Sequence, residues 1–294
     1  MWSSIFKCIP AIWMLRIARL RLIHSTGCVQ NGEKNMNGEL HQLLLITALG
    51  NGNLMSGADA SNSELEHTGF LDVRFLAEGG GQSWNWPEWL AELKNNGCQR
   101  LMLNGTASTA AWNSSGFSGN GAPGGVTSLG ACGESLWKAE WRMDQYRSRT
   151  KWKVTYTEQK IADGQQGSRE FLPLADISAH LEEVLREIGA LADGIGEQFW
   201  TNNFFEPARD ILKGKAPAAQ PPFQLPAVYK DQARILLNAV YKAWVFGGMG
   251  SWNDNPPYSA YLHEREQDYT LLSARLYETL VQCARGAVNS VVLL

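Results

Sequence analysis

Alternating apolar and polar residues predict a strand early in the chain. Between residues 70 and 77, Val73 and Phe75 fall on one side, and Asp72 and Arg74 fall on the other. Side chains of an extended strand point to opposite faces in turn, so this pattern indicates a strand with one buried face.

The same alternation occurs twice more between residues 137 and 160. The apolar positions are mostly aromatic, and the polar positions hold seven cations against three anions. Two amphipathic strands joined by a polar connection predict a β-hairpin with its rings on one face and its charges on the other. The apolar positions are Trp137, Ala139, Trp141, Met143, Trp152, Val154 and Tyr156.

Helical spacing predicts two helices in the N-terminal half. Residues 39–49 form an apolar helical face, and the Gly-Asn-Gly tripeptide at 50–52 is typical of a helix end. A second helix begins at Pro87 and ends at Gly97, before a strand at 98–103. Strand, helix and strand together suggest a small crossover unit.

From Leu174 onward, apolar residues recur at helical spacing. The pattern predicts four helices, over residues 174–194, 197–212, 227–246 and 256–288. Tyr261 and Leu262 belong to the apolar face of the fourth helix. Four prolines at 213–226 predict an extended Pro/Ala linker between the second and third helices.

These elements predict an α+β fold, in which a small N-terminal sheet with a short helix and a hairpin is packed with or linked to a C-terminal layer of about four helices. We divide the chain into a non-core extension at 1–35, an α+β region at 36–170 and a helical region at 171–294. Residues 104–133 are rich in Gly and Ser and carry no charge, so we expect a loop there.

Composition narrows the class of protein. The net charge of -3 favours neither a polyanionic partner nor a strongly acidic surface. The five cysteines show no CxxC spacing and are odd in number, which is typical of free thiols and predicts a cytoplasmic protein. Twelve tryptophans require burial or an interface.

The first 35 residues differ from the rest because basic side chains interrupt an apolar run. Arg16, Arg19 and Arg21 leave it short of the roughly 20 residues that span a bilayer, so no transmembrane segment is expected. An organelle-targeting segment, a membrane-surface helix and translated sequence upstream of the true start all fit. We favour the last, because Met36 directly precedes a helical pattern.

Common catalytic signatures are absent from the sequence. It has no GxSxG, HExxH or Walker motif, and no GxGxxG between a strand and a helix. His180-Leu181-Glu182 has the HxE form of zinc deaminases, but no PCxxC follows. His263 and Glu264 fall in a charged helical segment. We therefore predict no cofactor and no metal site.

One loop concentrates glycine, amide and carboxylate groups between the third and fourth helices. A helix corner, with Gly247 ending one helix and Asn255 capping the next, explains part of it. Such a corner does not require the polar and aromatic residues between them, and glycines also bring backbone amides close to a ligand. The candidate binding residues are Gly247, Gly248, Gly250, Ser251, Trp252, Asn253 and Asp254.

Three functions from different classes fit these features. The first is a protein without catalysis of its own that binds a protein partner through residues 247–254, with Trp252 at the contact. The second is a hydrolase-type enzyme that uses Asp254 as acid or base, with Ser251 or Asn253 positioning the substrate. The third is nucleic-acid binding by the basic hairpin at 137–160.

The loop also carries a resemblance. Gly247-Gly248-Met249-Gly250-Ser251, an apolar residue and then Asn253-Asp254 resemble a GGMGS-x-ND signature of small uncharacterised bacterial proteins. The resemblance covers the C-terminal quarter, and it implies a bacterial helical domain without an assigned activity. The chain departs from the pattern at Asn255-Pro256-Pro257, where an apolar residue would be expected.

Overall fold

The computed structural model describes residues 36, 38–57, 60–61, 65, 72–105, 124–131, 133–146, 149–162, 172–216, 223–247 and 250–292, with the backbone alone at 143–146 and 149–152. The predicted extension at 1–35, residues 106–123 of the predicted loop, residues 217–222 of the linker and Gly248 lie outside these residues. Residues on both sides of position 170 belong to one compact unit, Lys34–Leu294.

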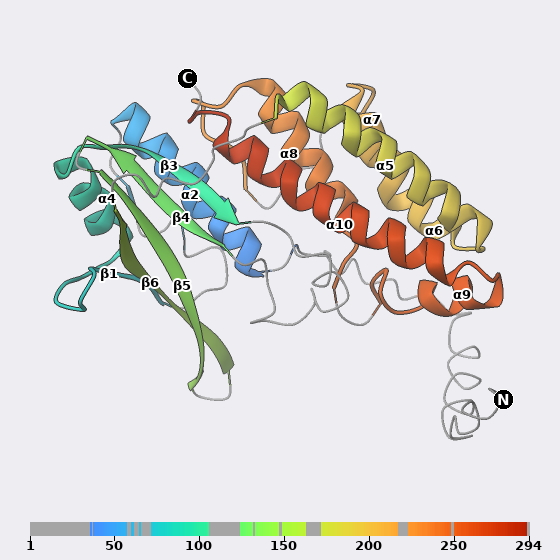
Figure 1. Cartoon of the computed structure of the whole chain (residues 1–294), viewed down its shortest axis with the longest axis horizontal. Coiled ribbons are helices and arrows are strands. Elements are labelled where there is room, and N and C mark those ends of the chain that lie inside the picture. Colours follow the sequence, from blue (N-terminus) through green and yellow to red (C-terminus); the bar gives the residue numbers. More distant parts are fainter. Residues whose placement is uncertain are drawn as a thin grey trace. The chain divides into compact units, whose positions relative to one another are not determined.

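Six strands form one mixed sheet in the order β2-β1-β6-β5-β4-β3 (Figure 1). Together with the C-terminal helices, the sheet makes the fold α+β. The strands are β1 (Asp72–Leu76), β2 (Ser83–Trp84), β3 (Cys98–Gly105), β4 (Gly124–Gly130), β5 (Gly133–Tyr146) and β6 (Arg149–Ile161).

The predicted hairpin is confirmed as β5 and β6, which pair antiparallel. Ala139 lies opposite Tyr156 and Trp141 lies opposite Val154, so the apolar positions share one face. Trp137 and Tyr156 are buried, whereas Lys138 and Lys153 are exposed. Alternation therefore placed these side chains correctly.

The crossover unit is not formed. β1 pairs in parallel with β6, while β3 lies at the far edge of the sheet, antiparallel to β4. The helix between them still forms as predicted, as α4 (Trp86–Asn95), and its Asn85 and Glu88 complete a capping box. Local signals gave the elements but not the strand partners, because β6 comes from much later in the chain.

Residues 124–130 form β4, so the predicted loop at 104–133 is wrong for this part. Its glycines allow neighbouring backbones to come close. A Cβ on Gly125 would lie 2.5 Å from the carbonyl oxygen of Trp137, and one on Gly130 would lie 2.3 Å from that of Gly97. The glycines of β4, which are typical of a loop, here allow its neighbouring strands to pack closely.

The first helix is longer than predicted. α2 (Gly38–Ser56) continues through the Gly-Asn-Gly tripeptide. A Cβ on Gly50 would meet Leu101 at 2.2 Å, and one on Gly52 would meet the Pro226 ring at 2.7 Å. These glycines let the helix lie close to β3 and to the segment that contains Pro226, and they do not end it.

An aromatic core lies between the sheet and α4. Phe75 stacks on Trp89 with ring centroids 3.9 Å apart and on Tyr156 at 5.2 Å, and Trp137 meets Trp89 edge to face at 5.2 Å. All four side chains are buried. This cluster accounts for part of the high tryptophan content, since large rings supply most of the apolar area that a small sheet can bury.

Two buried asparagines cover the β3 edge of the sheet. Asn51 of α2 donates to the carbonyl of Leu101 at 2.8 Å and accepts from its N–H at 2.7 Å. Asn289, at the end of α10 (Glu266–Asn289), does the same for Leu103, at 2.9 and 2.8 Å. Each amide takes the place of a peptide group from a further strand, so the edge is satisfied without another chain.

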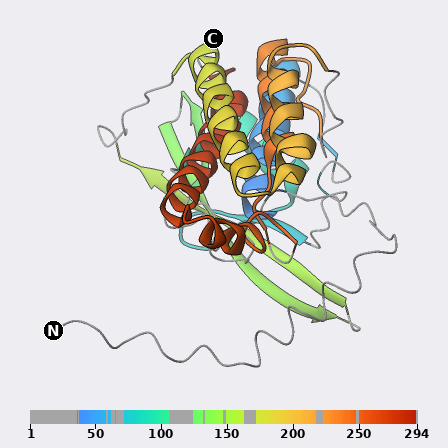
Figure 2. The ribbon, with the colours of Figure 1, turned by 90° about the vertical axis from the view of Figure 1, so that its right-hand side faces the viewer.

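The C-terminal half forms the predicted helical layer. α5 packs against α10, which lies beside it in Figure 2 as a red helix next to a yellow one. α5 also contacts α7, and α8 contacts both α7 and α10. None of the helices in the described ranges has both the length and the apolar character to cross a bilayer. The helices are α5 (Leu174–Gly194), α6 (Gln198–Trp200), the π-helical turn η2 (Thr201–Phe205), α7 (Glu206–Leu212), α8 (Asp231–Ala243), α9 (Pro256–Leu262) and α10 (Glu266–Asn289).

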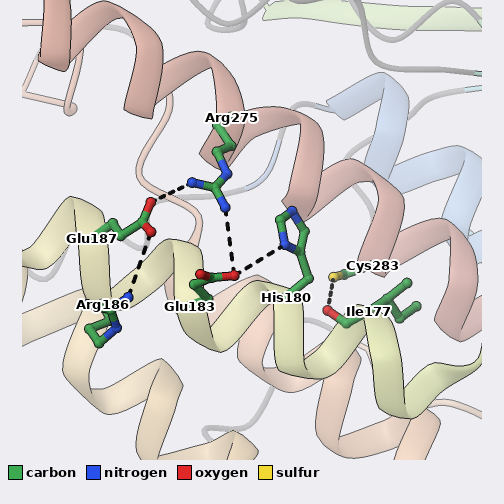
Figure 3. Close-up of polar contacts among 7 residues, drawn as sticks. All are labelled: Ile177, His180, Glu183, Arg186, Glu187, Arg275 and Cys283. Carbon is green, nitrogen blue, oxygen red and sulfur yellow. Dashed lines mark hydrogen bonds and ion pairs between the residues drawn. The ribbon is translucent and has the colours of Figure 1, made fainter.

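Ion pairs and close packing join α5 to α10 (Figure 3). Arg275 reaches both Glu183 and Glu187 on successive turns of α5. About three turns further along α10, the backbone comes so close that a Cβ on Gly286 would meet Ile177 at 2.4 Å. Cys283 lies in the same contact, with its sulfur 3.5 Å from the Ile177 carbonyl.

The predicted fourth helix is two helices. α9 ends at Leu262, and Glu264 takes a left-handed conformation with φ 56° before α10 begins. The break changes which face of α9 is buried. Tyr261 and Leu262, expected on the apolar face of one long helix, are therefore exposed, at 63% and 56%.

Candidate functional site

The loop between α8 and α9 is a tight corner closed by backbone hydrogen bonds. α8 ends at Ala243, and the chain then continues extended through the buried Val245 and Phe246. The N–H of Trp252 donates to the Val245 carbonyl at 3.0 Å and turns the chain back. The corner is thus held at its base by a pair of apolar residues.

Trp252 is completely buried under this corner. Its indole N–H donates to Ser273 Oγ at 2.8 Å, and its carbonyl accepts from the Tyr269 hydroxyl at 2.8 Å. The rings of Trp200, Phe205 and Tyr269 surround it with centroids 5.5 to 5.7 Å away. Trp252 is part of the core of the helical layer, so the prediction that it lies at a contact surface does not fit its position.

The polar side chains around Trp252 shape the turn. Ser251 Oγ donates to the Gly247 carbonyl at 3.0 Å and accepts from the Asn253 N–H at 3.2 Å. The carboxylate of Asp254 accepts from the Gly250 N–H at 2.9 Å. The structure does bring Ser251, Asn253 and Asp254 together, but these bonds stabilise the corner.

Two predicted details of the corner need correction. The left-handed glycine is Gly250, with φ 74°, and not Gly247, because α8 ends before Gly247 is reached. Asn255 makes no side-chain cap for α9, since its own backbone is already helical. Its carbonyl accepts from the N–H groups of Tyr258 and Ser259, and Pro256 takes the first helical position as predicted.

The described residues give little support for metal or thiol chemistry. Within the described ranges, no three His, Cys, Asp or Glu side chains are grouped so that they would hold a metal ion. His263 Nδ1 lies 2.8 Å from the Ser259 carbonyl, at the end of its own helix. Burial raises the pKa of the Cys283 thiol to about 12, which suits a core residue better than a nucleophile.

The polar face of the hairpin carries charges of both signs. Arg142 pairs with Glu140 at 2.9 Å, and on the neighbouring β1 Arg74 pairs with Asp72 at 2.9 Å. Trp137, which is buried, lies on the other face. Ring stacking and phosphate contact would therefore need two different surfaces of the same ribbon.

One partly buried histidine was not singled out by the sequence. His41 of α2 lies 2.8 Å, through Nδ1, from the hydroxyl of Tyr241 on α8, and the ring of Phe223 packs edge-on at 5.7 Å. Burial lowers the pKa of His41 to about 4. The imidazole is therefore neutral at physiological pH.

Three exposed apolar side chains on α9 form a surface next to the corner. Tyr258, Tyr261 and Leu262 are 52%, 63% and 56% exposed. The two tyrosine rings lie nearly parallel with centroids 6.5 Å apart, so they make one continuous area. We refer to these three residues as the α9 surface.

The α9 surface is held rigidly by its neighbours. Ser259, on the same helix, donates to Glu197 at the start of α6 at 2.6 Å. The Arg265 N–H donates to the Ala260 carbonyl at 2.9 Å and closes the end of α9. Pro256 and Ala260 are buried beneath it. Side chains on such a support lose little freedom when they bind.

Sequence periodicity missed the α9 surface because it assumed one uninterrupted helix. The charged run His263-Glu264-Arg265-Glu266 directly after Leu262 is the signal that breaks the apolar pattern. A helix boundary at this run would have assigned Tyr261 and Leu262 to a separate short helix.

Comparison with known proteins found no match for this chain among protein-family models, curated proteins or solved structures.

Proposed function

We propose that this protein acts by binding a protein partner, and that the α9 surface is the contact. The observation that carries the proposal is the exposure of Tyr258, Tyr261 and Leu262 on a single helix of seven residues. Single exposed apolar residues are ordinary, but adjoining ones on a rigid support are typical of interaction sites. Tyrosines are also enriched among the residues that dominate binding energy.

In this proposal the loop at 247–254 has a supporting role. Trp252 anchors the corner in the core, and Asp254 lies exposed two residues before α9. The proposed contact with the partner is therefore the neighbouring helix α9 and not the indole of Trp252. A Trp252→Ala variant would be expected to disturb the fold and would not test the interface.

Site-specific photo-crosslinking in the native host tests the proposal. A benzophenone amino acid at position 261 should yield one major protein adduct, and the same group at position 172 should not. Leu172 is a suitable control because its side chain is 55% exposed and it lies just before the start of α5. Glu197, which contacts α9, lies beyond the other end of the same helix. The partner would then be purified and titrated against variants.

We expect Tyr258→Ser or Tyr261→Ser to weaken binding of the purified partner about 30-fold, since a hot-spot residue contributes roughly 2 kcal/mol. Leu172→Ser should leave the affinity unchanged. Equal binding by the tyrosine variants, or the absence of any adduct at position 261, would overturn the proposal.

A further inference from the structure

The surroundings of the α9 surface are strongly acidic. Residues 193–200 and 250–268 together carry six carboxylates and one arginine, a net charge of -5, whereas the whole chain has -3. The remaining residues therefore carry +2. The carboxylates belong to Asp193, Glu197, Asp254, Glu264, Glu266 and Asp268.

Contacts bring two of these acids, Glu197 and Glu264, to α9 itself. Glu197 accepts from Ser259, which lies between Tyr258 and Tyr261. The N–H of Glu264 donates to the carbonyl of Tyr261 at 3.2 Å. Arg265, the cation of this group, is paired with Asp268. The field at the tyrosines is consequently negative, and it favours a cationic partner.

Glu264 has an unusual backbone conformation. It takes the left-handed conformation, with φ 56°, at a helix end where glycine is normally favoured. A side chain in this conformation costs roughly 1–2 kcal/mol. Glu264 is exposed, and within the described part of the chain its carboxylate forms no hydrogen bond or ion pair. The carboxylate is therefore available to a partner.

Tyrosine faces next to carboxylates suit the guanidinium group in particular. Arginine stacks on aromatic rings and also forms paired hydrogen bonds with a carboxylate, whereas lysine acts as a hydrated point charge. We infer that the partner presents an arginine-bearing segment to the α9 surface, with guanidinium groups stacked on Tyr258 or Tyr261 and paired with Glu264. The inference rests on the proposed function.

Labelled eight-residue peptides test this with the full-length protein. One alternates Arg and Leu, the second Lys and Leu, and the third Glu and Leu. We expect the Arg peptide to bind, the Lys peptide to bind at least fivefold more weakly, and the Glu peptide to show no saturable binding. The affinity for the Arg peptide should fall as salt rises from 50 to 300 mM, because the exposed charges are screened.

Glu264→Gly separates binding from folding. It removes the carboxylate and also relieves the left-handed backbone, so the variant should unfold at higher denaturant while it binds the Arg peptide about tenfold more weakly. Glu264→Gln should show the same loss of affinity without the gain in stability. If Glu264 had only a structural role, these variants would not lower the affinity for the Arg peptide independently of stability.

The two proposals fail in different ways. If the Arg and Glu peptides bind alike, if the Arg peptide does not bind, or if Glu264→Gly leaves its affinity unchanged, the arginine inference is overturned. In each case, a crosslinked partner that depends on Tyr258 and Tyr261 would leave the proposed function standing. Loss of that dependence would remove both.

Discussion

The indole of Trp252 depends on one hydroxyl for its buried N–H. Ser273 of α10 provides it and is itself completely buried. We expect Ser273→Ala to lower the free energy of unfolding by about 1–3 kcal/mol, because the indole donor would lose its partner away from water. Urea unfolding followed by tryptophan fluorescence measures the change.

Thr270→Ala on the same helix is the control for this prediction. Its hydroxyl donates to the Glu266 carbonyl on the exposed side of α10. Its loss should cost no more than about 0.5 kcal/mol. If both variants lose the same small free energy of unfolding, the hydrogen bond of the Trp252 indole contributes no more to stability than an exposed one.

His41 links stability to pH. Its pKa is about 4 in the folded protein and about 6.5 in an unfolded chain, so the unfolded chain binds more protons between these values. The contribution of His41 to the free energy of unfolding is fully present above pH 6.5 and is lost as the pH falls to 4. At about 1.4 kcal/mol per pH unit, the loss reaches roughly 3 kcal/mol.

The variant His41→Gln isolates this contribution from that of other acids. Between pH 7 and pH 4, the wild type should lose about 3 kcal/mol more stability than the variant, as measured by urea unfolding at each pH. Parallel pH profiles of the two proteins would contradict the assignment. The histidine NMR titration provides a direct check on the pKa.

At the level of single residues, the sequence identified the corner but not the purpose of its side chains. The glycines and Pro256 predict a tight reversal before a helix, which is correct, but the left-handed glycine is Gly250 and not Gly247. The burial of Trp252 depends on rings contributed by two other segments, the continuous stretch of α6 and η2 (Trp200 and Phe205) and α10 (Tyr269). No local pattern reveals such a contact.

Among the elements, α2 shows how a glycine in a helix can serve packing. A Cβ on Gly52 would lie 2.7 and 2.8 Å from two carbons of the rigid Pro226 ring. We expect Gly52→Ala to destabilise the protein by about 1–3 kcal/mol, although alanine is the better helix former. Thermal and urea unfolding measure the effect.

Gly189 in α5 provides a matched control, because a Cβ there would meet Thr201 at an ordinary 3.6 Å. Gly189→Ala should therefore stabilise the protein by about 0.5–1 kcal/mol. Opposite signs for these two glycines would confirm that close packing, and not helix propensity, keeps Gly52 as glycine. The same sign would refute it.

Helices and strands with a clear period were predictable, and those with special packing were not. α5, α4 and the hairpin follow the local pattern closely. β4 was missed because its glycines are typical of loops, and they are needed here for close strand packing. The break between α9 and α10 was missed because glutamate is not the residue expected in a left-handed conformation, so only the charged run at 263–266 marks the boundary.

In the molecule as a whole, Asn51 and Asn289 join the helices α2 and α10 to the edge of the sheet. The Tyr229 hydroxyl connects them, since it accepts from Asn51 at 3.2 Å and donates to the Val288 carbonyl at 2.9 Å. We expect Asn289→Ala to cost about 2–4 kcal/mol, because it leaves the N–H and carbonyl of Leu103 without partners. Equilibrium unfolding measures this loss.

The same variant should also associate, because an open strand edge pairs with other chains. Light scattering after size exclusion would show dimers or larger species that the wild type lacks. Asn96→Ala, which removes an exposed amide bound to Glu92, should change neither stability by more than about 0.5 kcal/mol nor association. A monomeric Asn289→Ala protein would show that the amide is not what blocks pairing.

The edge of β3 is synthesised before the residue that covers it. Leu103 and Asn289 are 186 residues apart, so the ribosome completes the strand long before it makes the amide that covers it. At roughly 5–20 residues per second, the interval is about 10–40 s. During this interval, the backbone N–H and carbonyl of Leu103 lack the Asn289 side chain as a hydrogen-bond partner. A nascent chain that stalls before α10 therefore keeps an open sheet edge, which neighbouring nascent chains or chaperones can bind.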